Sequence, residues 1–146
     1  MKTVRATVIT DASFCHHTRS GGWAAWVTIN TFYELGAPRV IRIKRYGTFH
    51  KRPKNSTEAE VWAAYNGIWL AYANGATDIL IQTDCTGAID RDHKGAAKKH
   101  WPDATVAWRH VKGHTDREEA RFFVNRWCDE HAGKMMRKQR RRSKRG

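Results

Sequence analysis

Two aspartates stand where a folded chain often places a ligand site. Asp11 directly follows a segment of alternating apolar residues, and Asp84 directly follows the short apolar run Ile79–Thr83. In open α/β sheets, ligands collect beyond the carboxyl ends of the strands. If both segments are adjacent central strands, the two carboxylates therefore share one crevice. Glu60 and Asp129 are further acidic residues, each placed within a segment of helical pattern.

Each of these carboxylates also has an ordinary structural explanation when it is taken alone. An aspartate in a turn or at a helix N-cap is at least as common as a catalytic one. Residues 57–60 form a capping-box sequence around Glu60, and Asn55 is a second candidate cap with Glu58 as its partner. Asp129 either faces solvent or faces the sheet, where its charge would be costly unless it were paired or bound to a cation. The single residues leave these alternatives open.

The hydrophobic pattern predicts the elements that would position these side chains. Alternating residues predict an antiparallel meander of three strands, at Thr3–Thr10, Trp23–Ile29 and Val40–Tyr46. Helices and strands then alternate, and we expect them at Glu58–Ala73, Ile79–Thr83, Thr86–His100, Thr105–Val111 and Arg117–Arg137. This order is typical of an α/β domain with a mixed sheet.

The composition restricts the class of protein. The chain has 146 residues, of which 40% are hydrophobic, so one domain can bury a core without disulfides or zinc. No stretch approaches the ~20 apolar residues of a membrane span, and the N-terminus lacks a signal-peptide pattern. Three scattered cysteines fit a reducing compartment. We therefore expect a cytoplasmic monomer with no membrane contact.

The charge of the chain predicts a polyanionic partner. Its formal net charge is +13, and eight basic residues with no acidic one lie between Lys134 and Gly146. Each phosphate neutralised by Lys or Arg releases condensed counterions and so favours binding at low salt. We divide the chain into a domain over residues 1–136 and a disordered basic tail over 137–146 that grips a phosphate backbone. The alternative is a solvated tail with no binding role.

Five fragments in chain order resemble the type 1 ribonuclease H family. They are Thr10–Ser13 with Gly21–Trp26, Ala59–Ala63, Thr83–Cys85, Val111–His114 and Asn125–Ala132. The resemblance implies an α/β ribonuclease H-like fold, with a five-stranded mixed sheet and helices on both faces. Only 29 residues separate Asp84 from His114, which resembles the compact branch that lacks a basic handle. The 14 residues between His114 and Asp129 exceed the usual loop of the family.

The resemblance also implies a reaction and the residues that carry it out. Asp11, Glu60, Asp84 and Asp129 would hold two Mg²⁺ ions, for which Mn²⁺ can substitute, because crowded carboxylates need divalent cations to balance their charge. Asp11 would bridge the two ions. His114 would assist proton traffic or product release. The expected activity is an endoribonuclease that cuts the RNA strand of RNA/DNA hybrids to 5′-phosphate and 3′-hydroxyl ends.

An RNA strand is distinguished from DNA by its 2′-hydroxyl groups. The family reads these groups through backbone amides and short polar side chains beside the metals. By position, the candidates for substrate binding in this chain are Ser13, Asn55, Ser56, Thr57 and Thr86. Each could equally cap a helix or a turn. Trp101, beside the cluster Lys98–His100, is the tryptophan we consider for nucleic-acid contact, whereas the spacing of Trp62 and Trp69 predicts core positions.

Three other functions remain open from the sequence. A basic nucleic-acid-binding module of the same fold could have lost its activity. Another nuclease of the superfold, such as a junction resolvase or an integrase, would differ at the motifs of Glu60 and His114. A zinc site could use Cys15, Cys85 and Cys128 with His16 or His17, although neighbours of a carboxylate along a strand point away from it.

Overall fold

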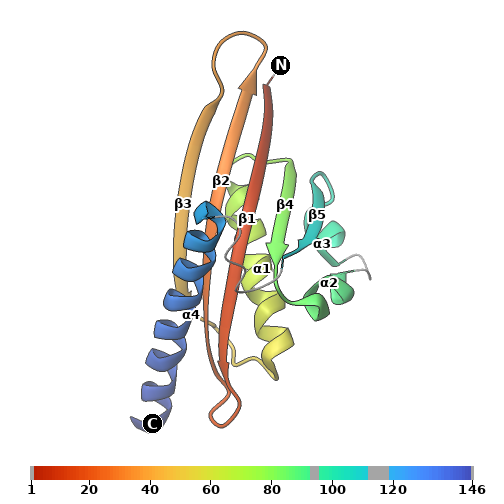
Figure 1. Cartoon of the computed structure of the whole chain (residues 1–146). Coiled ribbons are helices and arrows are strands. Elements are labelled where there is room, and N and C mark those ends of the chain that lie inside the picture. The colour runs from red at the N-terminus through yellow and green to blue at the C-terminus, as the bar shows by residue number, and fades with distance from the viewer. Residues whose placement is uncertain (1, 93–95, 112–118, 146) are drawn as a thin grey trace.

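A mixed β-sheet of five strands organises the chain, in the order β3-β2-β1-β4-β5 (Figure 1). The computed structural model describes residues 2–92, 96–111 and 119–145. The antiparallel meander consists of β1 (Lys2–Cys15), β2 (Ser20–Tyr33) and β3 (Arg39–Thr48). β4 (Asp78–Thr83) pairs in parallel with β1, and β5 (Thr105–His110) pairs in parallel with β4. The expected mixed sheet, a meander followed by two parallel strands, is confirmed.

Both faces of the sheet carry helices, as expected. α1 (Ser56–Ala73) covers one face and α4 (Glu119–Arg145) crosses the other, while the short helices α2 (Thr86–Asp92) and α3 (Ala96–His100) connect β4 to β5. The main core lies between the sheet and α1, where Val8, Val27, Ile29, Ile68, Ile79 and Ile81 are buried. A smaller cluster under α4 includes Trp26 and Cys128.

Two glycines let these helices approach the sheet closely. A Cβ atom on Gly67 of α1 would lie 2.5 Å from Val8 Cγ1 and 2.7 Å from Thr10 Cγ2. A Cβ atom on Gly22 of β2 would overlap the backbone of α4 at Ala132. Larger residues at these positions would push the helices away, which overpacked interiors tolerate poorly.

β1 is longer than its sequence pattern predicts. It continues past Thr10 to Cys15 because β2 pairs with it along its whole length, and Asp11 lies inside the strand, opposite Ala24. The expectation that Asp11 follows the strand is therefore wrong. β4 pairs with β1 only as far as Ile9, opposite Gln82, so β4 leaves that edge of β1 unpaired at Asp11.

The tryptophans correct two expectations. Trp69 is 58% exposed, because α1 packs against the sheet through small residues and Ile68 rather than through its tryptophans. Trp62 is half-buried against Phe49. Trp101 is buried in the main core, with its ring 5.8 Å from that of Tyr65, so it does not present a face to nucleic acid. Among the described residues, no helix is long and apolar enough to cross a membrane.

The C-terminal residues form a helix instead of the expected disordered tail. α4 continues through Arg145, and Gln139 is buried against the sheet. Its Oε1 atom accepts a hydrogen bond from the Gly21 N–H group at 2.6 Å, and its Nε2 atom donates one to the Phe49 carbonyl at 3.0 Å. The expected tail over 137–146 is thus wrong for residues 137–145. The expected start of this helix, at Arg117, lies outside the described residues.

Replacing Gln139 by Leu should destabilise the protein by about 1–3 kcal/mol, because it leaves a buried N–H group and a buried carbonyl without their partner. Urea unfolding monitored by circular dichroism measures this loss. Arg141→Ala, an exposed change half a turn further along the same helix, should stay within about 0.5 kcal/mol of the wild type. Equal stability of the two variants would contradict the anchoring role of Gln139.

Candidate metal centre

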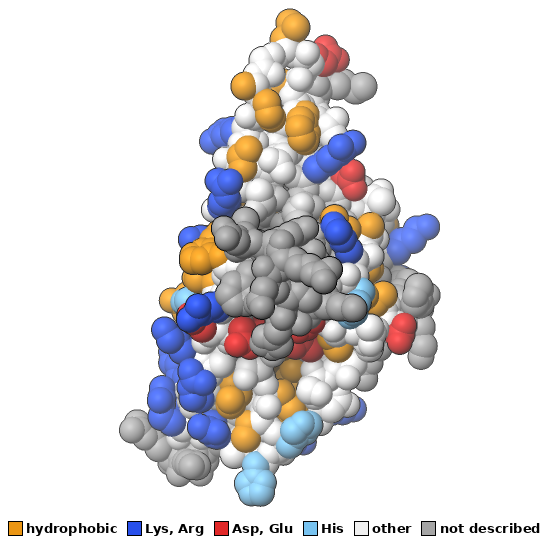
Figure 2. Space-filling view, viewed as in Figure 1, with side chains coloured by type: hydrophobic (Ala, Val, Ile, Leu, Met, Phe, Trp, Pro, Cys, Tyr) orange, Lys and Arg blue, Asp and Glu red, His pale blue; other side chains and the backbone are white. Residues whose placement is uncertain are grey.

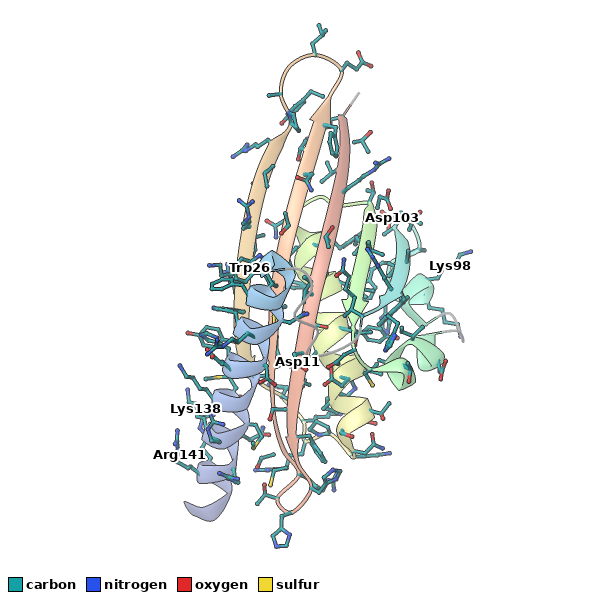
Figure 3. The ribbon with its side chains drawn as sticks, in the orientation of Figure 1. Asp11, Trp26, Lys98, Asp103, Lys138 and Arg141 are labelled. Atoms are coloured by element: carbon teal, nitrogen blue, oxygen red, sulfur yellow. The ribbon has the colours of Figure 1, made fainter. Side chains whose placement is uncertain are left out.

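Three carboxylates converge at the unpaired edge of β1. Asp11 comes from β1, Glu60 from the second turn of α1, and Asp84 from the residue that follows β4. One oxygen of each lies within 4.8 Å of the others, which makes them a candidate site for a metal ion. Asp11 lies on β1 between α4 and α1 (Figure 3). The sequence therefore predicted three of the site residues correctly as neighbours in space.

The N-terminus of α1 fixes the position of Glu60. The Asn55 side chain caps the helix by accepting a hydrogen bond from the Glu58 N–H group at 2.8 Å, and Glu58 in turn accepts one from the Lys54 N–H group at 3.2 Å. Glu58 is thus occupied by the cap, which leaves Glu60 to face the sheet. The resemblance-based choice of Glu60 over Glu58 agrees with this geometry.

One backbone group holds two of the carboxylates together. The Ala12 N–H group donates to Asp11 Oδ1 at 2.9 Å and to Glu60 Oε1 at 3.3 Å. Sequence reasoning missed this donor, because a backbone amide leaves no signal in the residue type. The shared bond brings an acid from the sheet and an acid from the helix to the same point.

Burial and mutual repulsion disturb the titration of both acids. Burial raises the pKa of Glu60 to about 10, and the charges of Asp11 and Asp84 act in the same direction. The pKa of Asp11 is raised to about 7, first by burial and then by the charges of Asp84 and Asp129. Glu60 Oε2 is buried without a hydrogen-bond partner. Hard oxygen donors in this state fit a divalent cation such as Mg²⁺ or Mn²⁺, which would supply the missing positive charge.

Asp129 lies beside this group of three but not within it. It is an exposed residue of α4 whose charge reaches Asp11 and contributes to the raised pKa of that carboxyl. Its neighbour Cys128 faces the sheet and its thiol lies 3.6 Å from the Ile9 carbonyl. The structure therefore brings Asp11, Glu60 and Asp84 together and leaves Asp129 outside this group, close enough for its charge to act on Asp11.

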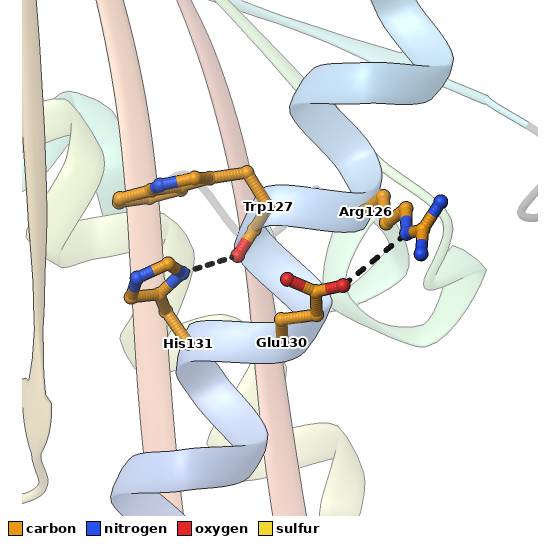
Figure 4. Close-up of polar contacts among 4 residues, drawn as sticks. All are labelled: Arg126, Trp127, Glu130 and His131. Atoms are coloured by element: carbon orange, nitrogen blue, oxygen red, sulfur yellow. Dashed lines mark hydrogen bonds and ion pairs between the residues drawn. The ribbon is translucent and has the colours of Figure 1, made fainter.

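Neighbouring polar residues of α4 are occupied elsewhere (Figure 4). Glu130 forms an ion pair with Arg126, with Nε and Oε1 3.2 Å apart. His131 Nδ1 lies 2.9 Å from the Trp127 carbonyl, which can only accept, so this nitrogen donates. The His131 ring also stacks on Trp127, with centroids 4.2 Å apart. Asp129 is thus the acidic residue of this turn whose charge acts on Asp11.

The expected substrate-binding residues gather at two helix starts. Asn55 and Ser56 are exposed at the start of α1, Thr86 is exposed at the start of α2, and Thr57 is half-buried. A Cβ atom on Gly87 would lie 3.0 Å from Thr57 Cγ2, so the two helix starts meet next to Asp84. Ser13 is half-buried in β1, two residues beyond Asp11. His114 lies outside the described residues.

The cysteines do not form the alternative zinc site. Among the described residues, the three carboxylates are the one cluster of acidic, histidine or cysteine side chains with metal-binding proximity. Cys128 is buried, and burial raises the pKa of its thiol and of the Cys85 thiol. The pKa of Cys15 is lowered to about 7, chiefly by a hydrogen bond with Thr18. The thiols thus sit in three separate environments.

Comparison with solved structures identifies the fold. The N-terminal RNase H domain of rv2228c from Mycobacterium tuberculosis superposes with a TM-score of 0.64 at 15% identity, covering 97% of this chain and 99% of that one. RNase H1 from the halophilic archaeon Halobacterium salinarum gives a TM-score of 0.59 at 17% identity, over 92% and 98% of the two chains. LC11-RNase H1, solved in complex with an RNA/DNA hybrid, gives 0.50 at 15% identity over 91% and 97%. No family model and no curated protein sequence matches the chain.

These similarities show that the chain has a ribonuclease H-like fold. The expected fold class is confirmed over nearly the whole chain. The three converging carboxylates occupy the central strand of that fold, the start of the strand–helix connection after β4, and the helix that covers the sheet.

The raised pKa values predict a pH dependence of stability in the metal-free protein. The folded chain retains the Asp11 proton above pH 4, where the unfolded chain has released it, so the stabilising contribution is lost as the pH rises toward 7. Asp11→Asn removes this loss. In EDTA, its free energy of unfolding should rise relative to the wild type between pH 5 and 8, on the order of 2 kcal/mol.

Asp90→Asn is the matched control, because Asp90 is an exposed carboxylate of α2 outside the cluster. Its stability should follow that of the wild type across the same pH range. If Asp11→Asn and Asp90→Asn show the same pH profile, the raised pKa of Asp11 does not cause the pH dependence of the free energy of unfolding.

Proposed function

We propose that this chain is a metal-dependent endoribonuclease that hydrolyses the RNA strand of RNA/DNA hybrids to 5′-phosphate and 3′-hydroxyl ends. The observation that carries the proposal is the convergence of Asp11, Glu60 and Asp84 within 4.8 Å, on a fold shared with a ribonuclease solved on such a hybrid. A cluster of three acids, two with strongly raised pKa values, is destabilising in itself and has an evident use only with cations.

The residues of the chain divide the work of the site. Asp11, Glu60 and Asp84 would hold the cations, and Asp129 would join Asp11 from the side of α4. Two divalent cations, when bound, would activate the attacking water and stabilise the departing 3′ oxygen. The Ala12 N–H group fixes the relative orientation of Asp11 and Glu60. His114 assists proton transfer or product release.

The choice of RNA over DNA depends on polar groups beside the cations. Ser56, Thr57 and Thr86 lie where the starts of α1 and α2 meet next to Asp84, and Ser13 lies beyond Asp11 on β1. Short hydroxyl side chains at such positions suit contact with 2′-hydroxyl groups. The Asn55 side-chain oxygen already caps α1, so its contribution comes from the amide nitrogen.

Affinity for the phosphate backbone comes from a basic stripe on α4. This stripe consists of the exposed residues Lys134, Arg137, Lys138 and Arg141, which recur every three or four positions and so share one helix face. Lys138 and Arg141 point away from the sheet (Figure 3), and basic side chains line α4 beside the acidic centre (Figure 2). Because Gln139 anchors this part of the helix, the stripe is a fixed surface rather than a loose tail.

The central experiment is a cleavage assay with end-labelled RNA/DNA hybrid, duplex RNA and duplex DNA. With Mg²⁺ or Mn²⁺, the wild type should cut the RNA of the hybrid, and Asp11→Asn should lower the rate to that of the wild type in EDTA, since the cations lose a shared ligand. Asp90→Asn should retain the wild-type rate. Hybrid binding without cleavage by the wild type would favour the silent binding module, and cleavage in EDTA would refute the mechanism.

The basic stripe makes a separate prediction about salt dependence. Replacing both Lys138 and Arg141 by Ala should weaken binding to hybrid and to duplex DNA alike. The slope of log affinity against log salt should flatten by about 0.9 for each phosphate that is no longer neutralised. The matched control replaces two exposed lysines of α3, Lys98 and Lys99. Equal flattening in both double variants would show diffuse attraction by the net charge instead of a defined stripe.

A further inference from the structure

The meander extends well beyond the helix that covers it. α4 packs on the sheet at Ala24 and Trp26. The first side chain of α4 that the structure describes is that of Phe123. β2 continues from Trp26 to Tyr33, and β1 starts at Lys2, opposite that end. Figure 1 shows these strand ends projecting past α4. Among the described residues, no helix covers this part of the α4 face.

The register of the strands identifies the side chains on this surface. Directly paired residues of antiparallel strands point to the same face, so Lys44 and Arg42 of β3 share the face of their partners Trp26 and Thr28. Two further positions along β2 lead from Thr28 to Asn30 and then Phe32. We name the surface formed by Arg5, Asn30, Phe32, Arg42, Lys44 and Phe123 the upper sheet face.

Aromatic and basic groups alternate on the upper sheet face. Phe32 is 41% exposed and Phe123 is 61% exposed. The Arg5 guanidinium lies 5.9 Å from the centroid of Phe32, and Lys44 Nζ lies 4.3 Å from the centroid of Trp26. Figure 2 shows hydrophobic and basic side chains side by side on this upper part of the molecule. The nearby acid Asp78 is already paired with Arg5, at 3.3 Å.

We propose that the upper sheet face binds single-stranded nucleic acid. Exposed aromatic rings provide faces for unpaired bases, and interleaved cations contact the phosphates between them. A duplex would not suit this surface, because its bases are stacked on one another and offer no free faces. A second copy packed by the same face would bring one basic surface against another, so charge complementarity favours a polyanion.

The dimensions of the surface fit this ligand. Phe32 lies six residues, about 20 Å, along β2 from Trp26, and the Phe123 ring lies 5.9 Å from that of Trp26, so Phe32 and Phe123 mark opposite ends of the face. This length spans several nucleotides of an extended strand. The surface is separate from the carboxylate cluster, which lies beyond the opposite end of the Trp26 region at Asp11 and Ala24. The inference therefore does not depend on the proposed nuclease activity.

The test is the binding of a fluorescent oligothymidine of 15 nucleotides to the full chain, measured by anisotropy in EDTA so that no metal site is involved. Phe32→Ala and Phe123→Ala should each weaken binding about tenfold, as expected for the loss of one base stack. Phe32→Tyr should retain the wild-type affinity, because its ring still stacks. Trp69→Ala is the matched aromatic control, since Trp69 is 58% exposed on the helix of the other face.

A second pair of variants tests the phosphate contacts on one strand. Arg42 and Arg45 are exposed arginines of β3 that point to opposite faces. Arg42→Ala should flatten the salt slope by about 0.7, whereas Arg45→Ala should leave it unchanged. Equal effects of the two changes, or equal losses in Phe32→Ala and Trp69→Ala, would overturn the proposal.

Sedimentation of the wild type and of Phe32→Ala tests whether a second copy of the chain binds to the upper sheet face instead. The proposal expects both to be monomers at every concentration. A concentration-dependent dimer that is lost in Phe32→Ala would assign the upper sheet face to a second copy of the chain and would overturn nucleic-acid binding there. Because cleavage of a blunt-ended hybrid does not use this face, failure of the oligothymidine test leaves the result of the cleavage assay unaffected, and the reverse also holds.

Discussion

The crowding of three carboxylates at the unpaired edge of β1 is the constraint on which the rest of the site depends. Two like charges a few ångströms apart repel each other, and burial adds the cost of removing the charges of Asp11 and Glu60 from solvent. The carboxylates stay close together despite this repulsion because independent contacts hold the segments that carry them. α1 is fixed by its Asn55 cap and by the close approach at Gly67, and β4 by its parallel pairing with β1.

The second face of the sheet is organised by a different kind of contact. α4 lies so close to β2 that Gly22 has no room for a side chain. Nearer the C-terminus of α4, the Gln139 side chain forms hydrogen bonds with the backbone of Gly21 and Phe49. This arrangement makes a helix of 27 residues out of a segment whose charges repel one another along much of its length. Tertiary hydrogen bonds therefore overcome a local preference for disorder, as is usual when packing decides helix stability.

Local patterns predicted the elements well and their ends poorly. The alternation in Thr3–Thr10 reports burial on one face, but the continuation of β1 to Cys15 depends on β2, which the pattern of β1 cannot contain. The helical tail escaped prediction because Gln139 bonds residues 118 and 90 positions away. Trp69 was misplaced because hydrophobic spacing favours large residues in the core, whereas this core selects alanine and glycine on α1. The three acids were recognised through the order of motifs, and the Ala12 amide that joins two of them has no sequence signature.

The surface of the protein and the carboxylate cluster act on a polyanion in opposite ways. A net charge of +13 attracts polyanions toward the whole protein, and the basic stripe of α4 lies beside the acidic cluster. The carboxylate cluster repels phosphate as long as its side chains are ionised and no cation neutralises them. Partial protonation of Glu60 and Asp11 lowers this repulsion but also removes the negative charge that makes their oxygens good cation ligands. Cations and protons thus compete for the same oxygens, and only the cations leave a positive charge with which a phosphate can interact. Long-range attraction of a polyanion therefore belongs to the surface, and under the proposed function a phosphate would enter the site only once cations are bound there.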